Sequence, residues 1–330
     1  MERLHILRQW LNQALGTEDY TLEPASSDAS FRRYFRAIHN ERHYIVMDAP
    51  PAHEDCAPFV QVSRLFQAAG ANVPEVLAQD IAQGFLLLTD LGNTTYLSAL
   101  NVGSAQNLYL DANAALIKIQ LASRPGVLPE YDRALLTREM NLFPDWYVGK
   151  HLNTQLDSAQ QETLHTVFER VLANNLAQPQ VYVHRDYHSR NLMVCGDAYG
   201  HNPGVLDFQD AVYGSITYDL ASLYKDAYIR WDEERVLDWV IRYWEQARAA
   251  RLPVSSDFYE FYRDFEWMGV QRHIKVLGIF ARLYHRDGKE AYLKDMPLVM
   301  DYLRKACERY SELVPMMRLL DELETIKERT

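Results

Sequence analysis

The strand-like spacing of apolar residues is confined to one part of this chain, and that division limits the folds the chain can adopt. Between residues 30 and 91, apolar and aromatic residues alternate or cluster in short runs such as "SFRRYFRAI", "HYIVMDA" and "GFLLLTDLG", which is typical of half-buried strands. From about Thr94 onward they recur every three or four residues, which is the period of an amphipathic helix. Two short apolar segments, "VYVHRD" and "GVLDFQD", interrupt the helical pattern. This order predicts a small sheet followed by a large helical region.

Two helices are expected to accompany the predicted sheet. The opening segment repeats leucine and tryptophan at helical spacing and ends at Gly16, a typical residue after a helix C-terminus. The segment "EDCAPFVQVSRLFQAAG" repeats the pattern and ends at Gly70. We therefore predict an α+β protein of two lobes, with a sheet-and-helix lobe over residues 1–91 and a helical lobe over residues 92–330. The segment "TDLGNT" is the compact hinge candidate between them.

Composition excludes several classes of function. The chain has 330 residues, of which 48% are apolar, so it can bury a large core. Its net charge of −11 argues against an extended nucleic-acid footprint. No apolar run approaches the length that crosses a membrane. The three cysteines are far apart and lack metal-ligand spacing, which is typical of reduced thiols in a cytoplasm. We expect a cytoplasmic protein with no nucleic-acid or membrane partner.

A dense polar cluster, "VHRDYHSRNLMV", lies at residues 183–194 between apolar residues. Asp186 and Asn191 have the separation of the kinase catalytic-loop pattern H-R-D-x-x-x-x-N. Further along, Asp207 ends an apolar run and precedes Phe208, as the metal-binding aspartate of kinases does. Phosphoryl transfer needs a carboxylate to orient the attacking hydroxyl and hard oxygen ligands for magnesium. The pattern therefore predicts Asp186 as the catalytic residue, with Asn191 and Asp207 as metal ligands.

These motifs resemble the aminoglycoside phosphotransferase-like family, small-molecule kinases that share the protein-kinase fold. The catalytic loop of that family commonly reads His-Gly-Asp-x-His-x-x-Asn, followed by Ile-Asp-Trp or Ile-Asp-Phe. This chain has the corresponding residues His184, Asp186, His188 and Asn191, and then Leu206-Asp207-Phe208. Several segments, including "ASFRRYFR", "VMDAPP" and "QRHIKVLGIFARL", are similar to the bacterial anomeric kinases of cell-wall recycling, which phosphorylate N-acetylmuramate and N-acetylglucosamine at C1.

The resemblance implies a bilobal protein-kinase-like fold and an ATP- and Mg²⁺-dependent sugar kinase acting on a small amino sugar. Two alternatives stay open. The acceptor of the phosphoryl group could be an aminoglycoside, choline or another amine alcohol. The chain could instead be a pseudokinase that binds a nucleotide without catalysis, and the lack of a lysine near Met47 is the feature that favours this alternative. The intact Asp186, Asn191 and Asp207 argue against it.

The predicted small lobe lacks two phosphate-binding features of kinases. The strand "HYIVMDAP" offers Met47 and Asp48 where kinases have a lysine, and "EPASSDASFRRYF" contains no glycine. Hydroxyl and guanidinium groups are the available substitutes for a glycine-rich loop and a lysine. Solvated positions on a strand are the alternative for each arginine. The candidate nucleotide-binding residues are Ser26, Ser27, Ser30, Arg32 and Arg33, with Arg36 as a further cation, and Leu88, Asp90 and Leu91, which would present backbone groups to adenine.

The remaining candidates support the loop or contact the acceptor. Arg185 replaces the family's glycine, and we expect it to brace the loop by bonding carbonyls or a carboxylate such as Asp219. His184, His188 and Asp219 are expected to hold the catalytic loop in shape. Planar polar and aromatic side chains hold sugars, so the acceptor candidates are Asp48, Glu139, Asp145 and Tyr213, for each of which packing or surface exposure is the alternative.

Overall fold

The computed structural model describes residues 2–27, 31–196 and 199–329 of the chain. Contacts divide the protein into two compact units, and each is made of two stretches of sequence. Unit 1 contains residues 1–119 and 190–210, and unit 2 contains residues 120–189 and 211–330. The functional lobes predicted over residues 1–91 and 92–330 stay a prediction.

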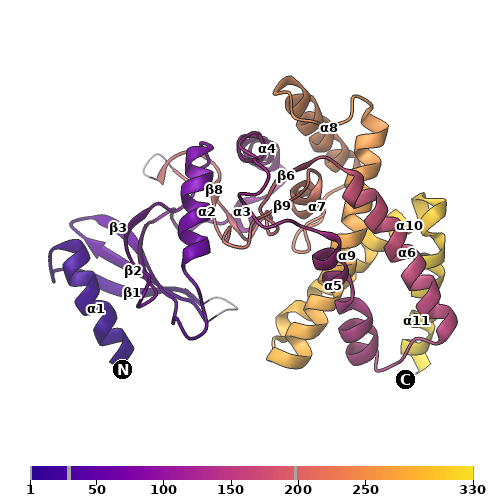
Figure 1. The fold of residues 1–330 in the computed structure, drawn as a ribbon, viewed down its shortest axis with the longest axis horizontal. Helices are drawn as coiled ribbons and strands as arrows, with labels where there is room; N and C mark the ends of the chain where they lie inside the picture. Colours follow the sequence, from indigo (N-terminus) through magenta and orange to yellow (C-terminus); the bar gives the residue numbers. More distant parts are fainter. Residues whose placement is uncertain (1, 28–30, 197–198, 330) are drawn as a thin grey trace. The chain divides into compact units, whose positions relative to one another are not determined.

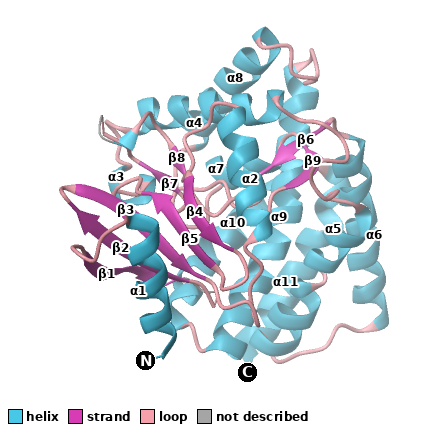
Figure 2. Ribbon diagram, turned by 60° about the vertical axis from the view of Figure 1, so that its left-hand side comes forward, coloured by secondary structure: helices cyan, strands magenta, loops and turns pink. Residues whose placement is uncertain are grey.

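Unit 1 is built on a five-stranded antiparallel sheet (Figures 1 and 2). This confirms the small sheet that the apolar pattern predicted, and it adds β1, which was not predicted. The strand order is β1-β2-β3-β5-β4. Asn40 and Glu41 form the turn between β2 and β3, with φ angles of 47° and 61°. The strands are β1 (Thr21–Ser27), β2 (Arg33–His39), β3 (Arg42–Asp48), β4 (Val76–Asp80) and β5 (Phe85–Thr89).

The two predicted helices of this unit are present and bury apolar faces. Helix α1 (Glu2–Leu15) packs Leu7 and Leu11 into a cluster with Val46 and Phe85 of the sheet, and it lies along the strands in Figure 2. Helix α2 (Ala57–Ala68) begins with a proline-containing first turn, because proline is favoured where amide groups have no helical partner. Its Phe59 ring lies 4.7 Å from the ring of Phe208.

Short elements complete unit 1. Helices α3 (Tyr96–Ala99) and α4 (Ala105–Leu121) follow the sheet. Strands β7 (Leu192–Met193) and β8 (Gly204–Val205) pair antiparallel. The amide of Val205 donates to the carbonyl of Asn72 at 2.7 Å, which fixes this ribbon to the chain ahead of β4. The apolar segment "GVLDFQD" is therefore a strand only at its first two residues.

Unit 2 is a helical assembly around the 30-residue helix α9 (Phe258–Asp287). Helix α9 packs against most other helices of the unit. Strands β6 (Gln180–Val183) and β9 (Val212–Ser215) form a two-stranded ribbon, which confirms the strand predicted at "VYVHRD". The remaining elements are α5 (Arg133–Met140), η1 (Phe143–His151), α6 (Ser158–Ala177), α7 (Tyr218–Tyr224), α8 (Glu233–Ala249), η3 (Glu290–Asp295), α10 (Met296–Arg309), η4 (Ser311–Leu313) and α11 (Val314–Arg329).

One predicted helix differs from its observed form. The segment "LLTREMNLFPDWYVGKHL" was expected to form a helix, and the structure divides it into α5 and the π-helix η1. Pro144 stands at the start of η1 and has no amide hydrogen to continue the bonding of α5. Across the described residues, no helix is both long and apolar enough to span a membrane.

Candidate active site

A cavity of about 500 Å³ lies within unit 1, a volume in the usual range for small-molecule sites. Ile45 and Phe59 form apolar walls, and the predicted residues Asp90 and Leu91 lie at its edge. Leu88 is buried inside β5, opposite Ile45 and Val76. The cavity also contains Asn191 and Asp207 among its lining residues, together with Tyr34, Arg36, Met193, Arg190 and Leu206.

Arg36 and Asp90 form an ion pair at the edge of this cavity. Arg36 Nε lies 2.5 Å from Asp90 Oδ2, and its Nη2 lies 3.1 Å from Oδ1. The other bonds of the pair involve Gly92, whose amide donates to Asp90 and whose carbonyl accepts from Arg36. The pKa of Arg36 is raised because Asp90 accepts its hydrogen bond. The pair therefore fixes the chain just after β5, where Gly92 has a φ of 89°.

Asp48 is completely buried and lies between two arginines. Arg33 stands directly opposite it in the β2–β3 register and donates to its Oδ2. Arg3 of α1 donates to Oδ1 at 2.7 Å and to the carbonyl of Gln83 at 2.7 Å. Asp48 was a candidate for acceptor binding, with packing or surface exposure as the alternative. The structure rules out surface exposure and gives Asp48 two arginine partners. Arg33, a candidate for phosphate binding, bonds this carboxylate, and its contact with phosphate stays a prediction.

The two candidate metal ligands converge within unit 1. Asn191 Nδ2 lies 3.4 Å from Asp207 Oδ2, and Gln209 Nε2 donates to Asp207 Oδ1 at 2.8 Å. Asp207 has a φ of 61°, and the buried Phe208 that follows it anchors the turn. No cluster of three or more histidine, cysteine or acidic side chains suited to a metal exists among the described residues. One carboxylate and one amide oxygen fit Mg²⁺, which keeps phosphate oxygens and water as further ligands.

Met47 occupies the strand position at which kinases carry a lysine, and it is buried. The guanidinium of Arg32 lies 3.9 Å from Asp207 Oδ1 and 3.9 Å from Glu54 Oε2. Among the three arginines predicted near phosphate, Arg32 therefore lies beside the candidate metal ligand. The backbone of Ser26 and Ser27 forms the end of β1, and the prediction for Ser30 lies outside the described residues.

The catalytic loop of unit 2 is held by the buried carboxylate of Asp219. Its Oδ2 accepts from the amide of His184 at 2.7 Å, and its Oδ1 accepts from the amide of Arg185 at 3.0 Å. His184 is buried and its Nδ1 accepts from the amide of Asp186 at 3.2 Å. Burial raises the pKa of Asp219 to about 6, although these hydrogen bonds and the nearby His184 oppose the shift. Asp219 and His184 thus accept the backbone amides of three consecutive residues, His184, Arg185 and Asp186.

Glu139, predicted as a possible acceptor ligand, is buried in a charged network. Its Oε1 lies 2.5 Å from Arg185 Nη2 and 3.0 Å from Lys275 Nζ. The hydroxyl of Tyr131 donates to its Oε2. Burial favours the protonated acid, but Lys275 and Arg185 outweigh that effect and lower the pKa of Glu139. Arg185 thus braces the loop through a carboxylate of α5, while its backbone amide bonds Asp219.

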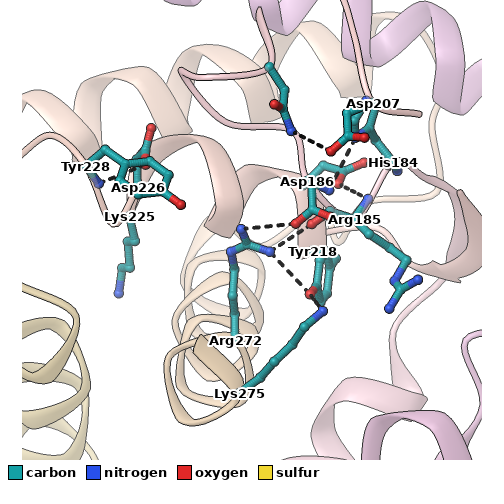
Figure 3. Close-up of polar contacts among 12 residues, drawn as sticks. His184, Arg185, Asp186, Asp207, Tyr218, Lys225, Asp226, Tyr228, Arg272 and Lys275 are labelled. Carbon is teal, nitrogen blue, oxygen red and sulfur yellow. Dashed lines mark hydrogen bonds and ion pairs between the residues drawn. The ribbon is translucent and has the colours of Figure 1, made fainter. Parts of the chain in front are cut away.

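Two cations of α9 influence the charge of the Asp186 carboxylate, and Figure 3 shows Arg272 beside that carboxylate and Lys275 beside Tyr218. Arg272 Nη2 is 3.9 Å from Asp186 Oδ1. Burial favours the protonated form of Asp186, but the charges of Lys275 and Arg272, followed by His188 and Arg185, hold its pKa below the ordinary value. The Asp186 side chain is 43% exposed. Asp186 is therefore a charged carboxylate that a substrate can reach.

The C-terminal half of the loop is fixed by a second buried carboxylate, that of Asp226. Asp226 Oδ2 accepts from the Ser189 amide at 2.9 Å and from its hydroxyl at 2.5 Å. The His188 ring meets the ring of Tyr228 edge-on, with centroids 5.4 Å apart. Asp226 also accepts from the Tyr228 amide at 3.0 Å. One short segment after α7 therefore orders this part of the loop.

The last two acceptor candidates, Asp145 and Tyr213, also belong to unit 2. Asp145 stands in the first turn of η1 and lines an open hollow with Asp132 and Arg138. Tyr213 lies in β9, where its amide donates to the Pro129 carbonyl at 2.7 Å and its ring packs edge-on against Tyr182. Their contact with an acceptor stays a prediction.

Sequence reasoning missed several residues of the site. Arg272 and Lys275 had a usable signal, because they place charge inside the almost wholly buried segment 265–278 of α9. A charged residue in a buried helical face requires a partner. Arg3, Tyr131, Tyr218 and Gln209 had no such signal, because their partners lie at distant positions in the chain.

The model of the phosphotransferase enzyme family matches residues 21–254. The N-acetylmuramate/N-acetylglucosamine kinase of Neisseria meningitidis serogroup B is 51% identical to the chain, over 98% of this chain and 96% of the relative. The kinase of the same name from Pseudomonas aeruginosa is 50% identical, over 92% and 88% of the two chains. An ADP-bound crystal structure of the aminoglycoside phosphotransferase APH(2'')-Ib shares the fold, with a TM-score of 0.58, 16% identity and coverage of 90% and 96%.

Proposed function

The protein belongs to the phosphotransferase enzyme family, and we propose that it transfers the γ-phosphoryl group of ATP to the anomeric hydroxyl of N-acetylmuramate and N-acetylglucosamine. The proposal rests on the sequence identity of 50–51% that this chain shares, over 92–98% of its length, with two N-acetylmuramate/N-acetylglucosamine kinases. The arrangement around Asp186 supports it, because a charged and accessible carboxylate is what the reaction requires of the protein. We predict a cytoplasmic location, where ATP is available.

In the proposed reaction, Asp186 accepts a hydrogen bond from the anomeric hydroxyl and orients its oxygen toward the γ-phosphorus. The bond from phosphorus to the bridging oxygen of ADP breaks as the new oxygen–phosphorus bond forms, and the hydroxyl proton passes to Asp186. An anomeric hydroxyl is more acidic than other sugar hydroxyls, which suits a carboxylate whose pKa is low. Orientation then contributes more than basicity to catalysis.

The cavity of unit 1 is the proposed nucleotide site. Ile45 and Phe59 would enclose the adenine, and backbone groups of Asp90 and Leu91 would bond its edge. Asn191 and Asp207 would hold Mg²⁺, which supplies positive charge between the β- and γ-phosphates when bound. Arg32 is our candidate for the missing lysine, because its guanidinium already lies beside Asp207.

A panel of acceptors tests the proposal. The purified full chain is incubated with ATP, Mg²⁺ and each of N-acetylmuramate, N-acetylglucosamine, an aminoglycoside and choline, and ADP release is measured. Phosphorus NMR then identifies the product. We expect a C1 phosphate from the two amino sugars. The matched control is the methyl glycoside of N-acetylglucosamine, whose anomeric oxygen is blocked and which should not be phosphorylated.

Two variants connect the activity to the site. Asp186→Asn and Asp207→Ala should each lower turnover by about 100-fold or more while the protein stays folded. Phosphorylation of choline or an aminoglycoside in place of the amino sugars would refute the acceptor, and so would turnover of the methyl glycoside. Nucleotide binding without transfer to any acceptor would support the pseudokinase alternative.

A further inference from the structure

Helix α9 places two buried cations beneath the catalytic loop. Arg272 and Lys275 are three residues apart, so they lie on the same face of the helix, and both side chains are over nine-tenths buried. Figure 3 shows both extending from α9 toward Tyr218 and the loop. Buried charges are costly unless they are paired and hydrogen-bonded. Their contacts therefore indicate what the two charges do.

Arg272 contacts the loop at two points. Its Nη1 donates to the carbonyl of Arg185 at 2.8 Å, and its Nη2 lies 3.9 Å from Asp186 Oδ1. Arg272 also contacts Tyr218: its Nη1 lies 3.3 Å from the Tyr218 hydroxyl, and its guanidinium lies 5.5 Å from the centre of the Tyr218 ring. One planar side chain thus connects the backbone ahead of Asp186 with the Asp186 carboxylate.

The backbone at Arg185 needs such support. Arg185 has a φ of 78°, a left-handed conformation that a residue other than glycine adopts at a cost of about 1–2 kcal/mol. Asp219 accepts from the Arg185 amide at one end of the residue, and Arg272 donates to the Arg185 carbonyl at the other. The two contacts fix both peptide groups that flank Arg185. This conformation determines where the next residue, Asp186, points.

The geometry at Asp186 leaves the carboxylate accessible. A separation of 3.9 Å is longer than a charge-assisted hydrogen bond, so Arg272 does not occupy the Asp186 oxygens as a close ion pair would. Lys275 is bonded to Glu139 and to the Tyr218 hydroxyl, both at 3.0 Å. Lys275 therefore acts on Asp186 through its charge, whereas Arg272 acts through contacts with the loop.

We propose that Arg272 is a positioning residue that holds the left-handed Arg185 backbone and thereby directs the Asp186 carboxylate toward the acceptor hydroxyl. This inference rests on the proposed kinase function, because it requires a phosphoryl acceptor. It does not depend on which acceptor is used. Arg272 acts through Asp186. Its loss should therefore lower kcat while the KM values for ATP and acceptor change little.

The first experiment compares Arg272→Gln with a matched control, Arg304→Gln. Arg304 is also a largely buried arginine of unit 2, but its partners are Asp321 and Glu324 of α11. Thermal unfolding establishes that each variant is folded, and steady-state kinetics give kcat and KM. We expect Arg272→Gln to lower kcat by about 100-fold, because small displacements of a reacting group have effects of that size. Arg304→Gln should retain the wild-type kcat.

A double-mutant cycle separates positioning from general stability. In an Asp186→Asn background, Arg272→Gln should lower the remaining kcat by less than about threefold, since residues that act as a unit are not additive. Tyr218→Phe is a milder second variant, in case Arg272→Gln does not fold. It removes the hydroxyl that contacts both Arg272 and Lys275, and it should lower kcat several-fold with KM unchanged.

Three results would overturn the inference. They are a folded Arg272→Gln variant with normal kcat, an equal loss of kcat in Arg304→Gln, and a full additional 100-fold loss in the Asp186→Asn background. The acceptor that wild-type enzyme uses is identified first from the acceptor panel. If that acceptor is not an amino sugar, the proposed substrate fails, yet the same kinetic comparison still tests Arg272.

Discussion

The buried carboxylate of Asp48 should make the two arginines beside it interdependent for stability. Arg3 bonds one carboxylate oxygen and Arg33 bonds the other, so either arginine alone still leaves Asp48 with a positive partner. Removing both leaves a fully buried carboxylate with neither cation. The perturbation is therefore a double-mutant cycle of Arg3→Ala and Arg33→Ala.

The single changes should be modest. The Arg33 side chain is half exposed, so screening by water limits its loss to about 1 kcal/mol. Arg3 is less exposed, and it also bonds the Gln83 carbonyl and lies over the Phe85 ring at 4.7 Å. Its removal should cost about 2 kcal/mol. Independent effects would therefore add to about 3 kcal/mol.

The double variant should cost more than that sum. Leaving a buried charge uncompensated costs about 3–5 kcal/mol, so we expect a total near 5 kcal/mol and a coupling of about 2 kcal/mol. Adding Asp48→Asn to the double variant removes the stranded charge while keeping the side-chain shape. It should recover about 2 kcal/mol of the free energy of unfolding.

Urea unfolding followed by circular dichroism measures these free energies, and hydrogen exchange of the β2 and β3 peptides shows whether the loss is local. Arg42→Ala, an exposed arginine at the start of β3, is the control and should change stability by less than about 0.5 kcal/mol. Additive losses from Arg3 and Arg33 would refute the reasoning. So would an increase in the KM for ATP in Arg33→Ala as large as that in Arg32→Ala, because Arg33 is assigned to Asp48 and Arg32 to phosphate.

Two further predictions concern α9. Lys275 is the nearby charge that lowers the pKa of Asp186 most, so Lys275→Met should raise that pKa. Asp186 acts in its ionised form, and that form is lost as the pH falls through the pKa of Asp186. In Lys275→Met the acid limb of the pH profile of kcat/KM should therefore move to higher pH. The control variant, Lys294→Met, should leave the acid limb unchanged. A Cβ at Gly278 would lie 2.3 Å from the carbonyl carbon of Leu142, whereas one at Gly269 would lie 3.3 Å from the flexible Lys225 chain. Gly278→Ala should therefore cost about 2–3 kcal/mol in urea unfolding and Gly269→Ala under about 1 kcal/mol, and equal losses would contradict this packing.

The parts of the fold that depend on local periodicity could be predicted from the sequence. The alternation in "SFRRYFRAI" and "HYIVMDA" identified β2 and β3, and the three-to-four-residue spacing identified the long helices, because each reflects burial of one face of one element. The π-helix η1 was not predicted, because apolar spacing does not distinguish it from an α-helix. A wider helix with Pro144 in its first turn has nearly the same apolar spacing as an ordinary helix over so few residues.

The partners of the charged residues could not be predicted in the same way. Asp48 and Arg33 are fifteen residues apart and became neighbours through the β2–β3 register, which a reading of spacing alone does not fix. Glu139, Arg185 and Lys275 come from α5, the catalytic loop and α9. Residue type marked them as polar groups needing a partner, but the choice among a substrate, a metal and another side chain is made by tertiary packing.

The replaced glycine and the missing lysine can be understood as two substitutions with different consequences. At Arg185 the chain accepts a strained backbone, and the side chain that causes the strain also gains the ion pair with Glu139. Strain of about 1–2 kcal/mol is smaller than the cost of breaking such a buried pair, so an arginine is stable there provided that Asp219 and Arg272 fix the flanking peptides.

At Met47 the strand carries no cation, and any replacement must reach the same phosphates from another backbone position. Arg32 directly precedes β2, and its guanidinium lies 3.9 Å from Asp207 Oδ1. This cation would therefore reach the phosphates from ahead of β2, the part of the sequence in which kinases carry a glycine-rich loop. One residue would then serve for both absent features, and this is why Arg32→Ala should raise the KM for ATP whereas Met47→Lys should not lower it.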